Sequence, residues 1–170
     1  MPLKKRHPLY AVLTILLFFA VLIFHTSDIA DISIKTATPL LIIPLLTAFS
    51  MFSSPLKAAV AGLISGACID GVAQKNFSFN TVVLIIVSVF VSLAASNLFN
   101  KNIRAAAVLS LITAVFYFVL LWALFYAFGV SPEQSLEYLL KYALPSAVYS
   151  SVFIIPFYFI FKHFDRKQNQ

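Results

Sequence analysis

The stretch AAVAGLISGACIDG, residues 58–71, contains three of the chain's four glycines and ends in the single carboxylate of an otherwise apolar segment. On a helix, Ala58, Gly62, Gly66 and Asp70 share one face, because they follow one another every four residues. Small side chains make this face flat, and flat faces allow the close helix contacts that drive association in lipid. We therefore predict a helix-packing or partner-binding face made of these four residues.

Asp70 closes this face, and its position is compatible with two roles. A carboxylate at membrane depth needs a polar partner or water. At the end of a membrane span, however, the same side chain can lie among the lipid headgroups. The sequence leaves both roles open.

The composition of the whole chain indicates a membrane protein. Hydrophobic residues make up 61% of the 170 residues, charged residues only 11%, and the mean hydropathy is +0.96. A soluble core of this size cannot bury so much apolar surface. The net charge of +6 does not indicate nucleic-acid binding, because the cationic residues stand at the ends of apolar segments rather than in one stripe.

Six apolar segments approach the length of about 20 residues that a membrane-spanning helix needs. They are Pro8–Phe24, Thr36–Ser53, Leu56–Ala73, Phe79–Phe99, Ala105–Phe128 and Tyr142–Phe161. The loops between them are short and no linker divides the chain. The prediction is an all-α, polytopic helical bundle forming a single transmembrane domain over residues 1–170. The first segment is interpreted as a retained helix rather than a signal peptide, since no small-residue cleavage pattern follows it.

Prolines and capping residues predict where some of these helices break or begin. Four prolines should kink or interrupt the second and sixth segments; they are Pro39, Pro44, Pro145 and Pro156. In the loop at residues 129–141, Ser131, Pro132 and Gln134 are arranged as an N-cap, a first-turn proline and a capping-box partner. A short helix should begin there, either lying at the membrane interface or leading directly into the sixth segment.

The distribution of Lys and Arg favours a cytoplasmic location for both termini. With six spans in that orientation, nine cations are cytoplasmic and three are not. The nine are Lys4, Lys5, Arg6, Lys57, Lys101, Arg104, Lys162, Arg166 and Lys167, and the three are Lys35, Lys75 and Lys141.

The residues do not assemble a recognisable catalytic, cofactor or metal site. The histidines His7, His25 and His163 all lie at segment ends. Ser65 lies mid-helix, and the glycine before it is one residue too far away for a Gly-x-Ser-x-Gly elbow. The lone Cys68 permits no intrachain disulfide and is expected to be a small packing residue. We expect no enzymatic activity and no cofactor.

The order of these features resembles the MreD family of rod shape-determining membrane proteins. The resemblance covers the basic N-terminus, the six short-looped spans, and Gly62-Leu63 followed by Gly66, Asp70 and a polar turn up to Asn80. One difference lies in residues 76–80, NFSFN, where many members of the family carry a glycine.

The resemblance implies a non-enzymatic scaffold subunit of the bacterial cell-elongation complex, which supports lateral peptidoglycan synthesis and cell shape. It also implies a multi-pass location in the bacterial cytoplasmic (inner) membrane. The implied partners are membrane lipid and MreC, and through MreC the actin-like MreB, RodA and a class B penicillin-binding protein. Self-association is left open.

The alternative is the substrate-binding S-component of an energy-coupling-factor vitamin transporter, another small six-helix membrane protein. That function predicts a vitamin pocket near the outer surface, closed by loops such as residues 25–35. For the scaffold, substitution of Gly62 or Gly66 by leucine is predicted to disrupt partner binding while leaving membrane insertion intact.

Overall fold

A computed structural model describes residues 8–26, 40–72, 78–97, 102–125 and 132–168, and these are helical with short connections. Within these ranges there is no strand, which confirms the predicted all-α class. The elements are α1 (Pro8–Thr26), α2 (Ile42–Met51), α3 (Pro55–Val72), α4 (Phe79–Asn97), α5 (Ile103–Phe125), α6 (Pro132–Tyr138), the π-helical turn η1 (Leu139–Ala143), α7 (Leu144–Val152) and α8 (Ile154–Gln168).

Among the described residues, three helical segments are long and apolar enough to cross a membrane: Phe79–Asn97, Ile103–Phe125 and Ser135–Arg166. They confirm the coarse prediction of a helical membrane protein. Two shorter apolar helices, Val12–Ile23 and Ile42–Met51, accompany them in the described part of the chain.

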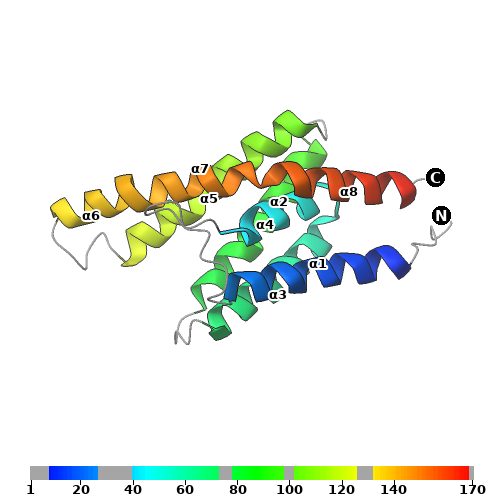
Figure 1. Cartoon of the computed structure of the whole chain (residues 1–170), viewed down its shortest axis with the longest axis horizontal. Coiled ribbons are helices and arrows are strands. Elements are labelled where there is room, and N and C mark those ends of the chain that lie inside the picture. The colour runs from blue at the N-terminus through cyan, green and yellow to red at the C-terminus, as the bar shows by residue number, and fades with distance from the viewer. Residues whose placement is uncertain (1–7, 27–39, 73–77, 98–101, 126–131, 169–170) are drawn as a thin grey trace.

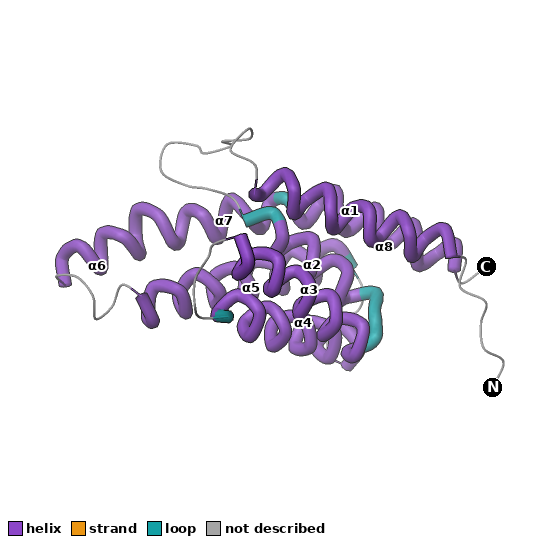
Figure 2. Tube along the Cα trace, turned by 90° about the horizontal axis from the view of Figure 1, so that it is seen from below, coloured by secondary structure: helices purple, strands orange, loops and turns teal. Residues whose placement is uncertain are grey.

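The last of these segments belongs to one nearly continuous helix made of α6, η1, α7 and α8. It runs along the length of the molecule in both views (Figures 1 and 2). The Ser135–Arg166 segment has 32 residues. At a rise of about 1.5 Å per residue this gives a length of about 48 Å, which exceeds the roughly 30 Å of bilayer hydrocarbon. The helix predicted to begin near Ser131 does begin at Pro132, and it leads directly into the sixth predicted segment.

Prolines mark the starts of helices in this fold. Pro44 lies in the first turn of α2, Pro145 is the second residue of α7, and Pro156 is the third residue of α8. In the first turn of α2, Pro44 removes an N–H group that has no helical partner in any case. Pro145 and Pro156 lie within the nearly continuous C-terminal helix, where the π-helical turn η1 precedes Pro145 and the turn at Phe153 precedes Pro156. Two of these positions carry the predicted interruption of the sixth segment, while Pro39 lies outside the described residues.

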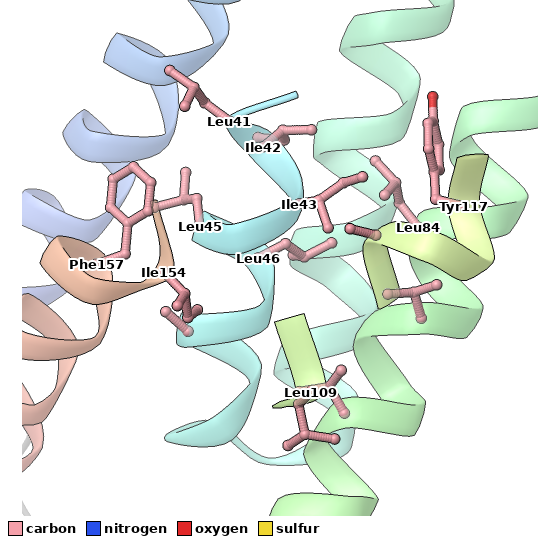
Figure 3. Packing of buried hydrophobic residues seen from close by; sticks show 14 of the residues in the cluster. Leu41, Ile42, Ile43, Leu45, Leu46, Leu84, Leu109, Tyr117, Ile154 and Phe157 are labelled. Atoms are coloured by element: carbon pink, nitrogen blue, oxygen red, sulfur yellow. The ribbon is translucent and has the colours of Figure 1, made fainter. Parts of the chain in front are cut away.

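The short helix α2 lies at the centre of the bundle. All of its residues are buried except Phe49, and it contacts α1, α3, α4, α5, α7 and α8. Figure 3 shows its leucines and isoleucines packed among side chains of α4, α5 and α8. The helix has 10 residues. It is therefore about 15 Å long, roughly half the hydrocarbon thickness of a bilayer.

Hydroxyl groups from neighbouring helices hold the residues that flank α2. The backbone N–H of Leu40, just before α2, donates to Ser150 Oγ on α7 at 2.8 Å. The hydroxyl of Ser92 on α4 donates to the carbonyl of Ser53, just after α2, at 2.7 Å. Irregular backbone inside a membrane bundle must be satisfied internally, and these contacts do so at both ends of α2.

The first and last described helices meet at one end of the bundle. The start of α1 and the end of α8 lie close to the same end in Figures 1 and 2, whereas α6 lies at the opposite end. The cationic C-terminal turns of α8 therefore lie at the same end as the start of the chain's first helix.

Candidate functional site

The predicted glycine face of α3 packs against α4 of the same chain. A Cβ atom added to Gly62 would lie 2.6 Å from the carbonyl oxygen of Leu84. One added to Gly66 would lie 2.7 Å from the backbone nitrogen of Thr81 and 2.8 Å from the carbonyl oxygen of Asn80. These distances leave no room for a side chain, so the two glycines permit backbone-to-backbone approach of α3 and α4.

The structure also places the ends of the predicted face inside the protein. Ala58 is fully buried and Asp70 is 8% exposed. An external partner of this face would have to displace α4. The face predicted for packing or partner binding is thus used within the chain, between two helices that are consecutive in sequence.

Asp70 accepts four hydrogen bonds from the first turn of α4. Its Oδ1 accepts from the backbone N–H of Asn80 at 3.1 Å and from Asn80 Nδ2 at 2.8 Å. Its Oδ2 accepts from the backbone N–H of Thr81 at 2.8 Å and from Thr81 Oγ1 at 2.6 Å. Every donor comes from two adjacent residues, so the carboxylate is held in one orientation.

These bonds make Asp70 an N-terminal cap of α4 that is supplied by another helix. The first N–H groups of a helix lack intrahelical acceptors, and a carboxylate both accepts from them and interacts favourably with the positive end of the helix dipole. Of the two roles that the sequence left open for Asp70, the structure shows the polar contact.

Asn80 extends this network from α4 to α5. Its amide nitrogen donates to Asp70, and its Oδ1 accepts from the hydroxyl of Tyr117. Beside this bond, the ring of Phe79 packs against those of Tyr117 and Phe125, with centroids 5.9 and 5.4 Å apart. The Asp70 cluster, defined as Asp70, Asn80, Thr81 and Tyr117, thus joins α3, α4 and α5.

Three members of this cluster, Asn80, Thr81 and Tyr117, were not predicted as site residues, and Asn80 was named only as the end of the polar turn in the resemblance. Thr81 follows Asn80 at the start of an apolar segment, and a polar pair there is a signal that could have indicated a helix start beside Asp70. Tyr117 lies 37 residues from Asn80, in a segment rich in aromatic residues. Nothing in its sequence surroundings separates it from the other aromatic residues.

A second polar contact ties α5 to α6. The indole N–H of Trp122 donates to the carbonyl oxygen of Ser135 at 2.9 Å and to its Oγ at 3.0 Å. In the next turns of the same long helix, Lys141 and Glu137 form an exposed ion pair of 2.6 Å. Exposed pairs of this kind contribute little to stability. The ion pair also lies within one helix, so of these two contacts it is the Trp122 hydrogen bonds that connect the start of the long C-terminal helix to α5.

The chemistry available to the cluster is hydrogen bonding between helices. Among the described residues, no group of three His, Cys, Asp or Glu side chains could hold a metal ion.

An apolar groove of about 210 Å³ lies between α4 and α5, lined by Ile86, Val87, Phe90, Ile112, Thr113 and Phe116. Residues 27–35 of the loop that the transporter alternative predicts as a lid lie outside the described residues.

The Tyr117 hydroxyl provides a mild test of the cluster. Tyr117→Phe removes the bond to Asn80 Oδ1 and leaves the ring contact with Phe79 in place. We expect a loss of about 1 kcal/mol in the free energy of unfolding, the usual contribution of one hydrogen bond. The measurement is thermal unfolding in detergent, with Tyr149→Phe as the control. An unchanged melting temperature in Tyr117→Phe would contradict a structural role for this bond.

The chain was also compared with known proteins. No protein-family model, no curated protein and no solved structure matches it.

Proposed function

We propose that the chain is a non-enzymatic scaffold subunit of the bacterial cell-elongation complex, as its resemblance to MreD implies. The observation that supports this most is the construction of the segment that carries the resemblance. Gly62, Gly66 and Asp70 belong to one close-packed joint whose carboxylate caps the following helix. The family-like residues are thus those on which the shape of the membrane bundle depends.

The proposed topology has six membrane segments with both termini in the cytoplasm of a bacterial cell. The start of α1 and the end of α8 lie at the same end of the bundle, which is compatible with this orientation (Figure 1). The excess of Lys and Arg assigned to that side supports it as well. In this arrangement the Asp70 cluster lies toward the outer surface of the cytoplasmic membrane.

The proposed partners are MreC and, through it, MreB, RodA and a class B penicillin-binding protein. Since α4 covers the glycines of α3, a partner must contact another surface of the bundle. The outward sides of α1, α4 and α5 carry exposed apolar residues that can contact lipid or a partner's membrane helix. We propose that binding takes place on such a surface, with the glycine joint fixing its shape.

The function is tested by purifying the tagged protein from its native membrane in mild detergent and identifying bound proteins and small molecules by mass spectrometry. The scaffold function predicts recovery of MreC and other cell-elongation proteins. Recovery of an ATPase module together with a vitamin would instead indicate the S-component of a vitamin transporter. Recovery of neither set from membranes that contain both would contradict the proposal.

A further inference from the structure

The interface between α2 and α5 contains a buried pair of threonine hydroxyls. The oxygens of Thr47 on α2 and Thr113 on α5 lie 3.2 Å apart. The Thr113 hydroxyl also donates to the carbonyl oxygen of Ser110 at 3.0 Å. With that proton engaged, the Thr47 hydroxyl acts as the donor within the pair, and both threonines are satisfied.

Serines stand one helical turn away from this pair on both helices. Ser50 follows Thr47 by three residues on α2, and Ser110 precedes Thr113 by three residues on α5. The two helices run in opposite directions: Figure 3 shows Leu41 to Leu46 descending along α2 while Tyr117 to Leu109 descends along α5. A step of three residues forward on one helix and three back on the other therefore moves the same way along the interface.

Both serines are fully buried, and their hydroxyl oxygens have no hydrogen-bond partner among the residues that the structure describes. Other helical serines of the chain donate to a carbonyl of the preceding turn; Ser88, Ser96 and Ser151 do so at 2.9, 3.0 and 2.7 Å. The hydroxyls of Ser50 and Ser110 make no such bond to a carbonyl of the described residues. Buried hydroxyls of this kind are generally satisfied by an ordered water when polar groups converge on it.

We propose that one water molecule is bound between Ser50 and Ser110 and links α2 to α5 beside the threonine pair. Two hydroxyls give a bridging water the minimum number of partners, and carbonyl oxygens of the adjacent helical turns can add to them. The inference does not depend on the proposed function. It assigns to the central short helix a hydrated contact with α5, in addition to the direct hydroxyl contact with α5 and the contacts of the flanking residues with α4 and α7.

The first test is a double-mutant cycle on the melting temperature of the full-length protein in detergent. Ser50→Ala and Ser110→Ala should each lower it by about 2–4 °C. The double variant should lose no more than either single variant, because the shared water is lost only once. Additive losses would overturn the proposal, and so would unchanged or raised melting temperatures, which dry or internally bonded hydroxyls would give.

Ser65 on α3 supplies the matched control, since its hydroxyl is also fully buried without a described partner but lies on a different helix. The effects of Ser65→Ala and Ser50→Ala should be additive. A second measurement needs no variant: solid-state NMR in liposomes should show magnetisation transfer from water to both Ser50 and Ser110. In Ser50→Ala the transfer to Ser110 should fall several-fold, and absence of transfer at both sites in the unmodified protein would overturn the proposal.

Discussion

Replacing Gly66 with leucine is expected to prevent the protein from reaching its folded state. The first atom of any side chain at this position would lie 2.7 Å from the backbone nitrogen of Thr81 and 2.8 Å from the carbonyl oxygen of Asn80. Backbone atoms cannot move aside as the end of a flexible side chain can, so α3 and α4 must separate. We expect a destabilisation above about 3 kcal/mol, beyond the usual range for overpacking.

The experiment compares Gly66→Leu with Gly71→Leu by size-exclusion chromatography in mild detergent. An added Cβ at Gly71 meets nothing within 4 Å, so that variant should elute as the unmodified protein does. Gly66→Leu should be lost to aggregates. A folded, monodisperse Gly66→Leu that fails only to bind partners would instead favour the sequence-based hypothesis of an external partner on this face.

Replacing Asp70 with alanine is expected to cause the second largest effect. The variant loses all four of the hydrogen bonds to Asn80 and Thr81 and leaves two backbone N–H groups at the start of α4 without their acceptor. Loss of an N-cap costs roughly 0.5–2 kcal/mol, and hydrogen bonds to a charged group contribute more than neutral ones. We expect Asp70→Ala to lower the free energy of unfolding by about 3 kcal/mol, measured by thermal or denaturant unfolding in detergent.

Two further substitutions distinguish the effect of losing the helix cap from the effect of removing any carboxylate. Asp70→Asn keeps the shape and one acceptor oxygen but presents an amide donor to other donors, so its loss should lie between zero and that of Asp70→Ala. Asp165→Ala removes a carboxylate near the end of α8 and should change stability by less than about 0.5 kcal/mol. Equal effects of Asp70→Ala and Asp165→Ala would contradict the capping role.

The sequence predicted helix boundaries well where the end of an apolar segment coincides with helix-breaking residues. The start of α4 at Phe79 coincides with the predicted boundary, and the boundaries of α3 and the start of α5 lie within two residues of the predicted ones. Proline and capping patterns predicted the helix that begins at Pro132. The second segment was predicted over Thr36–Ser53. Residues 36–39 lie outside the described residues, and in the rest of the segment α2 contains only Ile42–Met51, because hydropathy does not mark where a buried helix begins and ends.

For each contact between α3 and α4 in the site, the sequence predicted one of the two partners but not the other. The spacing of Gly62, Gly66 and Asp70 indicated a packing face but could not show which helix covers it, since small residues permit contacts within a chain as readily as between chains. Thr81 and Tyr117 became members of the cluster only through the three-dimensional arrangement, since a hydrogen bond across 37 residues leaves no local pattern.

The short helix α2 constrains how the protein is made. At about half the hydrocarbon thickness, its helical part does not cross the bilayer by itself, so its position depends on the contacts that neighbouring helices make with it and with its flanking residues. The groups that hold it, on Ser92, Thr113 and Ser150, are all synthesised after it. Its final position is therefore reached only after most of the chain has left the ribosome, so the centre of the bundle is completed last during biogenesis.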